Sequence, residues 1–367
     1  FLVPKFLPNA DGSLGARNDL KCLSIEHKLG IHGSPTCVMG YGEGGGATGF
    51  LVGEPNSGMR LMFTMMNMAR LSVGNEGVAI AEAATQMALA FARERVQGRV
   101  LGAPEGAPIL QHPDVLRMIL QMKALTGAAR AICLATAFAI DEAHTATSDA
   151  ARTAASEREN ILTPIAKSFA TDIGVEVASL GVQVHGGMGY IEETGAAQLW
   201  RDSRIAPIYE GTNGIQALDL LTRKLPLRGG QAFAELAGDF TAEAQLVYAS
   251  RDPVVASLAP LLNSAGKTMA EAGQALLRGM EKHRGASFAV AASFLRLCGL
   301  SLGALYLARA SRVAGSLPDD RSQRGRKRLA AFYFYHLLPA AMPLAAEIQG
   351  ALARETFSGF DPAEIEE

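Results

Sequence analysis

The sequence predicts a mainly α-helical protein, in which a partial β region is followed by an antiparallel helical bundle and a second helical domain. Three observations predict this fold. The chain has 367 residues, which is enough for two or three domains. Beyond residue 57, long stretches repeat apolar residues at three- and four-residue steps, the spacing of one helix face. Hydrophobic residues make up 49% of the chain and charged residues only 19%, which excludes a disordered chain.

Residues 1–57 are expected to form strands and turns. The predicted strands are short apolar runs at residues 1–7, 37–39 and 48–53. A glycine-rich segment, 40–46, separates the last two. Its glycines Gly40, Gly42 and Gly45 match the GxGxxG spacing of a phosphate-binding loop, but that loop must open a helix, whereas a strand is predicted here. A turn between two strands is therefore favoured.

Residues 58–226 are expected to form a helical bundle of three long and two shorter helices joined by brief loops. The expected helices cover residues 61–95, 113–149, 157–185, 193–201 and 211–224. Small residues in the first of them, such as Gly74 and Gly77, allow helix axes to approach closely.

A boundary is predicted at Pro226, Gly229 and Gly230. Residues 231–367 are then expected to form a second helical domain. Its antiparallel helices are expected at residues 233–250, 253–282, 286–315 and 321–355.

Residues 329–346 contain no Asp, Glu, Lys or Arg and follow a basic cluster at 324–328, a pattern at the lower length limit for a membrane-spanning helix. His336, Pro339 and Pro343 interrupt the stretch, so a buried, kinked helix is favoured. Peripheral contact with a membrane through the basic cluster stays open.

Charge and cysteine usage exclude several classes of protein. The chain carries 34 Lys and Arg against 36 Asp and Glu, a formal net charge of −2, which argues against nucleic-acid binding by bulk positive charge. The four cysteines are Cys22, Cys37, Cys133 and Cys298. Without a CxxC pair they form neither a disulfide scaffold nor a cysteine zinc site, and they indicate a reducing, cytoplasmic location. His32, His112 and His185 each stand alone, so no metal site is predicted.

The candidate chemistry lies in three neighbouring segments: 183–190 (QVHGGMGY), 201–204 (RDSR) and 209–216 (YEGTNGIQ). Gly186 and Gly187 allow backbone to approach a bulky ligand, and Gly211 and Thr212 supply amides and a hydroxyl at a helix N-terminus. Glu210 is a loop carboxylate that can act as a base. From the residues alone, the alternative is a charge that favours the dipole of the following helix.

These segments resemble the C-terminal signature of acyl-CoA dehydrogenases. Segments 28–36 and 67–70, and the run Arg95-Val96-Gln97-Gly98-Arg99, extend the resemblance over residues 1–225. Residues 231–367 resemble the extra helical domain of a larger subfamily that includes long-chain enzymes and methylmercaptopropionyl-CoA dehydrogenases. The resemblance implies that residues 1–57 are the second half of a middle β domain. We therefore expect the sequence to be a fragment.

The resemblance implies FAD as cofactor and assigns residues to it. Arg95 and Gln97 would contact the FAD of a neighbouring subunit, although Gly98-Arg99 follows Gln97 where the family has Phe-Gly. The adenosine diphosphate half would contact Gln183, Gly186 and Gly187, and the flavin half Thr212 and Asn213. From the residues alone, the alternatives are a helix-end cation for Arg95, a helix C-cap for the glycines and a helix N-cap for Thr212.

Glu210 would be the catalytic base, removing the α-proton of an acyl-CoA thioester while hydride leaves to the flavin. Tyr209 and Gly211 would lie against the substrate, as would Arg70, whose alternative is a buried helix cation paired with a carboxylate. The implied activity is the introduction of an α,β double bond, with electrons passed to an electron-transfer flavoprotein by a homodimer or homotetramer. The alternative is a non-enzymatic or DNA-associated relative, whose DNA-binding form the net charge disfavours.

Overall fold

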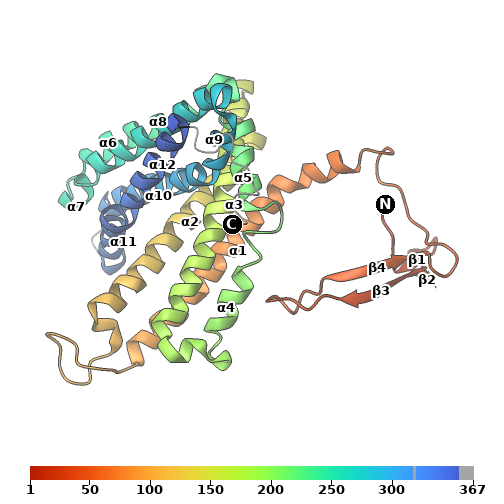
Figure 1. Ribbon diagram of the computed structural model, residues 1–367, viewed down its shortest axis with the longest axis horizontal. Helices are drawn as coiled ribbons and strands as arrows, with labels where there is room; N and C mark the ends of the chain where they lie inside the picture. Colours follow the sequence, from red (N-terminus) through yellow and green to blue (C-terminus); the bar gives the residue numbers. More distant parts are fainter. Residues whose placement is uncertain (317–319, 355–367) are drawn as a thin grey trace. The chain divides into compact units, whose positions relative to one another are not determined.

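The computed structural model describes residues 1–316 and 320–354. The chain divides into two compact units, Phe1–Ala69 and Arg70–Glu367 (Figure 1). The division falls inside helix α1 (Gly58–Glu94), which begins at the residue where the sequence pattern changes.

The first unit contains two antiparallel strand pairs. β1 (Phe6–Pro8) pairs with β2 (Leu14–Arg17), and β3 (Leu20–Ile25) pairs with β4 (Cys37–Tyr41). The predicted strand at 48–53 is wrong, because only Phe50 pairs there, in an isolated bridge with Leu2. Buried Asn18 holds the segment instead, since its side chain donates to the carbonyls of Pro4 and Thr48 and accepts from the Thr48 amide.

The glycine-rich segment after β4 is a turn, as predicted. The amides of Gly44 and Gly46 donate to Asp19 Oδ2 over 2.7 and 3.1 Å. Because a carboxylate of the chain itself occupies these amides, they do not form a phosphate-binding loop.

The second unit is built on α1, α2 (Pro113–Thr145) and α3 (Asp149–His185), with the turn η1 (Ile109–Gln111) before α2. α3 begins eight residues earlier than predicted, after Ser148, whose side chain accepts from the Ala151 amide. The first turns of α3 are polar and alanine-rich, so apolar periodicity did not reveal them.

Close backbone packing joins α1 to α3, as the small residues predicted. A Cβ atom added at Gly77 would lie 2.4 Å from the carbonyl oxygen of Ala170, and one at Gly174 would lie 3.0 Å from that of Gly77. The two helices therefore touch backbone to backbone at a point where only glycine fits.

Shorter elements follow α3: η2 (Gly186–Tyr190), η3 (Glu192–Thr194), α4 (Ala196–Ser203), α5 (Asn213–Asp219), a π-helical turn η4 (Leu220–Lys224) and η5 (Leu227–Gly230). The predicted boundary at 226–230 is a kink, where Arg228 and Gly229 have φ values of 50° and 67°.

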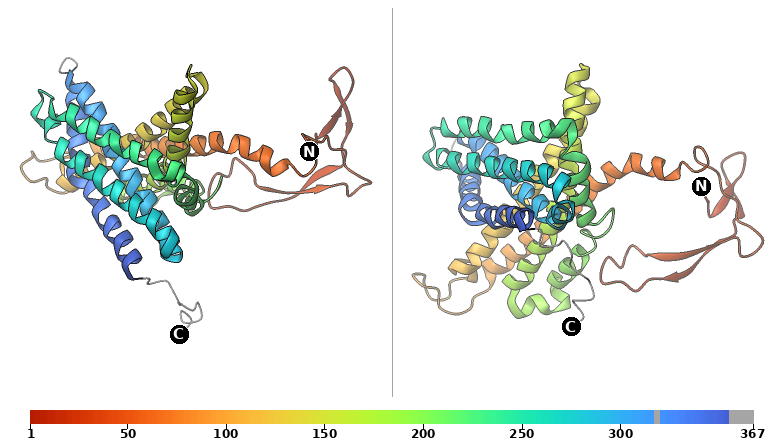
Figure 2. Two further views of the ribbon diagram at one scale, coloured as in Figure 1. Left: turned by 90° about the horizontal axis from the view of Figure 1, so that it is seen from above. Right: turned by 45° about the horizontal axis from the view of Figure 1, so that its top comes forward.

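Helices of the C-terminal part lie across α2 and α3 (Figure 2). They are α6 (Gln231–Tyr248), α7 (Pro253–Ala256), α8 (Ala259–Lys282), α9 (Arg284–Ala289), α10 (Ala291–Ser316), α11 (Arg321–Phe332), the turns η6 (Tyr333–Leu337) and η7 (Leu338–Ala340), and α12 (Ala341–Arg354). α10 packs against α2, α3, α8 and α12.

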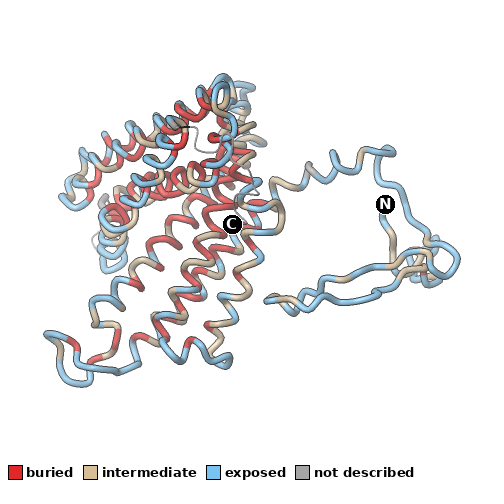
Figure 3. The backbone as a smooth tube through the Cα atoms, in the orientation of Figure 1, coloured by how far each residue is buried: buried red, intermediate tan, exposed pale blue. Residues whose placement is uncertain are grey.

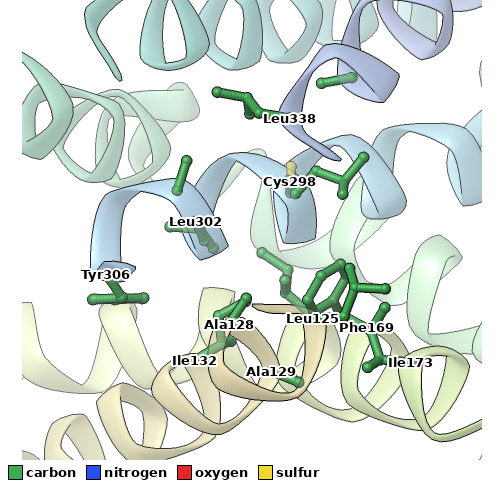
Figure 4. Close-up of a cluster of buried hydrophobic side chains, with 14 of the residues drawn as sticks. Leu125, Ala128, Ala129, Ile132, Phe169, Ile173, Cys298, Leu302, Tyr306 and Leu338 are labelled. Carbon is green, nitrogen blue, oxygen red and sulfur yellow. The ribbon is translucent and has the colours of Figure 1, made fainter. Parts of the chain in front are cut away.

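One hydrophobic core runs through this unit without a break at residue 230 (Figure 3). Figure 4 shows its centre, where Leu125 and Ile132 of α2 and Phe169 of α3 meet Cys298 and Leu302 of α10. Residues beyond 231 thus share a core with the bundle.

Within the part of the chain that the structure describes, three helical stretches are long and apolar enough to cross a membrane by length and composition: Pro113–Thr145, Ala291–Ala314 and Arg321–Ala353. The second has 83% of its apolar window buried against other helices. The stretch predicted as a buried, kinked helix is interrupted at η6 and η7, and its predicted burial holds for one face only: Tyr333 and Phe334 lie in the core, but just 28% of its window is buried. Tyr335 and Met342 lie on its exposed side.

Candidate functional site

Two groups of the predicted site residues lie at different heights along α3. One group surrounds the C-terminal end of the helix, at Gln183. The other surrounds Lys167, sixteen residues earlier, which at 1.5 Å per residue is about 24 Å away along the helix axis.

The first group lines a cleft of about 690 Å³ at the end of α3. Gln183, Gly186 and Gly187 come from α3 and η2, and Arg95 and Gln97 come from the segment after α1. The structure therefore brings together five residues that the sequence assigned to the cofactor.

Local hydrogen bonds shape both walls of this cleft. Gly186 follows α3 as its C-cap, as predicted, and its φ of 58° turns the chain out of the helix. This turn forms the α3 side of the cleft. The opposite wall is pinned because Ile109 donates its amide to the Arg95 carbonyl over 2.7 Å, and His112 Nε2 lies 2.9 Å from the Gln97 carbonyl.

The cleft suits a large anionic ligand. Arg95 and Gln97 are exposed and so is Gln183, while nothing lies within 4 Å of a Cβ built at Gly186 or Gly187. The guanidinium of Arg95 can pair with a diphosphate, and the side-chain amides of Gln97 and Gln183 can hydrogen-bond to it or to an attached adenosine. The uncovered backbone at Gly186 and Gly187 leaves room for such a ligand.

His185 lies under the cleft in a structural role, as predicted. Its ring packs against Phe91 at 4.6 Å between centroids, and its Nδ1 lies 2.7 Å from the Gly181 carbonyl in the preceding turn. Among the described residues, no cluster of three His, Cys, Asp or Glu could hold a metal ion.

The second group lies on residues 209–213, which lead from the segment after α4 into the first residue of α5; we call this segment the base loop after the role that the sequence predicts for Glu210. Glu210 has a φ of 54° and Gly211 a φ of 83°, both in the left-handed region. A glutamate there costs free energy, and such positions persist where the surrounding contacts over-determine them. Glu210 is partly exposed, so its carboxylate can reach a ligand.

Within the described residues, the backbone amides of Glu210 and Gly211 donate to no acceptor. Thr212 does act as the N-cap of α5, because its Oγ1 accepts from the Ile215 amide over 3.2 Å. The loop thus offers a carboxylate and two open donors side by side.

Lys167, a fully buried residue of α3, anchors this loop. Its Nζ donates to the Gly211 carbonyl over 3.0 Å and to Asn213 Oδ1 over 2.9 Å. Asn213 in turn donates to Asp172 Oδ1 over 2.7 Å. The Asn213 side chain is therefore engaged with α3, although the sequence assigned it to the flavin.

Tyr209, assigned to the substrate, donates its hydroxyl to Glu76 of α1. Burial, and then the hydrogen bond to Glu76, raise the pKa of Tyr209 above its ordinary value. The phenol thus fixes the loop to α1.

Arg70 is a buried helix cation paired with a carboxylate, which was the alternative to a substrate contact. Its side chain is buried and pairs with Asp219 of α5 over 3.3 Å between Nη1 and Oδ2, while its Nε has no hydrogen-bond partner. Arg70 therefore holds α5, the helix that follows the base loop, against α1.

Sequence reasoning missed Lys167, Glu76 and Asp219, because their partners lie 44, 133 and 149 positions away in the chain. Only Lys167 left a signal. It is the one charged residue in the apolar run ILTPIAKSFA, and a charge buried at such a position needs partners.

The family model described as the C-terminal domain of acyl-CoA dehydrogenases matches residues 56–225, and the model described as acetyl-CoA dehydrogenase C-terminal like matches residues 233–353. Among curated proteins, the 3-methylmercaptopropionyl-CoA dehydrogenase of Ruegeria pomeroyi is 54% identical over 241 residues, which cover 64% of this chain and 40% of that protein. A butyryl-CoA dehydrogenase of Syntrophomonas wolfei is 38% identical over 252 residues, which cover 66% of this chain and 41% of that protein.

Among solved structures, an acyl-CoA dehydrogenase of Bacillus anthracis complexed with FAD has a TM-score of 0.69 at 19% identity, over 95% of this chain and 58% of that one. ACDH-11 of Caenorhabditis elegans has a TM-score of 0.72 at 18% identity, over 95% and 56%. These two establish similarity of fold. The chain spans about two fifths of the length of the curated relatives it matches.

Proposed function

The chain belongs to the acyl-CoA dehydrogenase family, and on this premise we propose that it is the C-terminal part of an FAD-dependent enzyme that introduces an α,β double bond into acyl-CoA thioesters. The observation that carries the proposal is the backbone of Glu210. A non-glycine residue held at a φ of 54° in a solvent-accessible loop, anchored by the buried Lys167 of α3 and the half-buried Glu76 of α1, indicates a side chain fixed for chemistry. The same observation favours an enzyme over a non-enzymatic relative.

Glu210 acts as the general base. An α-proton of a thioester is weakly acidic, and a carboxylate within reach removes it as the enolate forms. The oxygen on which the enolate charge develops needs preorganised donors, and the open amide of Glu210 supplies one of them. Bound FAD would supply the acceptor for the β-hydride, because no protein side chain accepts hydride.

The residues of the cleft fit the adenosine diphosphate half of FAD. Arg95 would pair with the diphosphate, Gln97 and Gln183 would hydrogen-bond to it or to the adenosine, and the open backbone at Gly186 and Gly187 leaves room for the ligand. Thr212 is on the exposed side of the base loop, where its backbone can meet the flavin half.

We propose a homodimer or homotetramer in which the cleft and the base loop of one chain serve different active sites. The separation of about 24 Å along α3 supports this arrangement, because a chain can then hold the adenosine half of its partner's cofactor. An electron-transfer flavoprotein as electron acceptor and a cytoplasmic location complete the proposal. Cysteine usage supports the location.

The relatives suggest two substrate classes, short fatty acyl-CoA and 3-methylmercaptopropionyl-CoA. The test is an anaerobic titration of the FAD-loaded, full-length protein with a panel of both. We expect one of these thioesters to bleach the oxidised-flavin band stoichiometrically. A flavin that stays oxidised with every thioester contradicts the proposed activity.

A further inference from the structure

We propose that Lys167 is a positioning residue for the catalytic base: its buried ammonium fixes the left-handed turn at Glu210 and Gly211 by binding the loop at two points. The inference rests on the proposed function of Glu210. Among the described contacts, the hydrogen bonds of Lys167 go to Gly211 and Asn213 and not to Glu210 itself.

The geometry of Lys167 is that of a clamp. Its side chain is completely buried within the middle of α3, and its Nζ reaches the Gly211 carbonyl at 3.0 Å and Asn213 Oδ1 at 2.9 Å. These acceptors lie one and three residues after Glu210. A single group therefore defines the path of the chain immediately after the base.

In its described contacts, the ammonium group of Lys167 hydrogen-bonds to the base loop and not to a carboxylate. Within the described part of the chain it forms no ion pair, although Asp172, Glu76 and Glu210 are near enough to favour its charged form and Arg70 disfavours it. A buried ammonium without an ion pair is costly unless hydrogen bonds compensate. Burial lowers the pKa of Lys167 to about 8, which agrees with that cost.

The consequence concerns the placement of the Glu210 carboxylate. A glutamate in the left-handed region relaxes toward a commoner conformation when its surroundings allow it. Without the clamp, the loop keeps the Tyr209 contact to Glu76, the Asn213 contact to Asp172 and a 3.3 Å hydrogen bond from Gln216 Nε2 to the Gly211 carbonyl, but it loses its charged donor. A shift of about 1 Å in a reacting group lowers a rate by about 10²-fold.

The test compares Lys167→Met with a matched control, Lys224→Met, in the full-length holoenzyme. Lys224 is a half-buried lysine of η4 whose Nζ donates to Asn160 Oδ1 and does not touch the loop. The measurements are kcat, KM, FAD content and the exchange of substrate α-hydrogen with D2O, which reports the base independently of flavin reduction.

For Lys167→Met we expect kcat and α-hydrogen exchange to fall together by about 100-fold, while KM and FAD content stay within about threefold. Lys224→Met should leave all four within about threefold. A kcat within threefold of wild type in Lys167→Met, or a loss confined to FAD content, overturns the inference.

If Lys167→Met does not fold, Asn213→Ala provides a second test, because it removes one of the two clamp points and keeps the lysine. We expect kcat to fall by at least about tenfold at unchanged KM, because the substitution removes the hydrogen bond from Lys167 together with the Asn213 hydrogen bonds to Ser168 and Asp172. An unchanged kcat contradicts the clamp. If wild type turns over and the variants keep its kcat, the result contradicts the role of Lys167 alone. If wild type never reduces its flavin, the result contradicts the proposed function.

Discussion

At the residue scale, Lys167 links the base loop to the pH dependence of stability. Its pKa is lowered from 10.5 to about 8, chiefly by burial. Between these two values the unfolded chain binds a proton that the folded chain does not, so the free energy of unfolding rises with pH in that window, by at most about 1.4 kcal/mol per pH unit. Below pH 8 both states are protonated and the lysine adds no slope.

We therefore expect the difference in unfolding free energy between wild type and Lys167→Met to be flat up to about pH 8 and then to shift in favour of wild type up to about pH 10.5. Urea unfolding of both proteins across this range measures it, and the titration of other groups cancels in the difference. A difference that stays constant, or that shifts toward the variant, shows that burial does not depress this lysine.

Single residues of the site were predictable from the sequence where they share a motif. The run YEGTNGIQ located Glu210, and QVHGGMGY located the wall of the cleft. The partners that hold Glu210 were not predictable, because Lys167 and Glu76 are brought to the loop by helix packing and not by sequence spacing. For the same reason the Asn213 side chain was assigned to the flavin, although it hydrogen-bonds to α3.

At the element scale, the contact between α1 and α3 is a tight constraint on the site, because α1 carries Glu76 and α3 carries Lys167. Substituting Gly77 with Ala would place a Cβ 2.4 Å from the Ala170 carbonyl oxygen, and the helices would have to separate. We expect a loss of about 1–3 kcal/mol in unfolding free energy from this overpacking.

Gly238→Ala is the matched control for this substitution. Gly238 lies inside α6 and a Cβ there meets nothing within 4 Å, so helix propensity alone should stabilise the variant by about 0.5–1 kcal/mol. Thermal unfolding of both variants decides the matter. Equal melting temperatures for the two would mean that α1 and α3 do not meet backbone to backbone.

Elements with strong apolar periodicity were predicted well, and the errors have physical causes. The helix at 113–149 was expected almost where α2 lies. The strand expected at 48–53 is not formed: Asn18 bonds both backbone groups of Thr48, and Phe50 makes a single bridge with Leu2. The stretch 329–346 was expected to be buried because it is apolar, but composition does not tell which apolar helix a core will cover.

At the scale of the whole molecule, α3 separates the cleft from the base loop, and we propose that each complete site needs two chains. Mixing two defective variants tests this. Glu210→Gln removes the base and Arg95→Ala weakens the cleft, so a mixed dimer has one site with both defects and one site with neither.

After dissociation and reassociation of an equal mixture, we expect activity to return to about a quarter of wild type, because half of the dimers are mixed and each has one intact site of two. Turnover with the preferred thioester is the readout. A mixture no more active than the mean of the two separate variants would place the cleft and the base loop in one site of the same chain.

The central claim is that Glu210 removes the α-proton, and the rate of flavin reduction in Glu210→Gln measures it most directly. The amide is nearly isosteric with the carboxylate but cannot accept the proton. In an anaerobic stopped-flow experiment on the full-length protein, we expect Glu210→Gln to keep its FAD and to reduce it about 10²- to 10⁴-fold more slowly than wild type. Reduction within a few-fold of wild type would contradict the account.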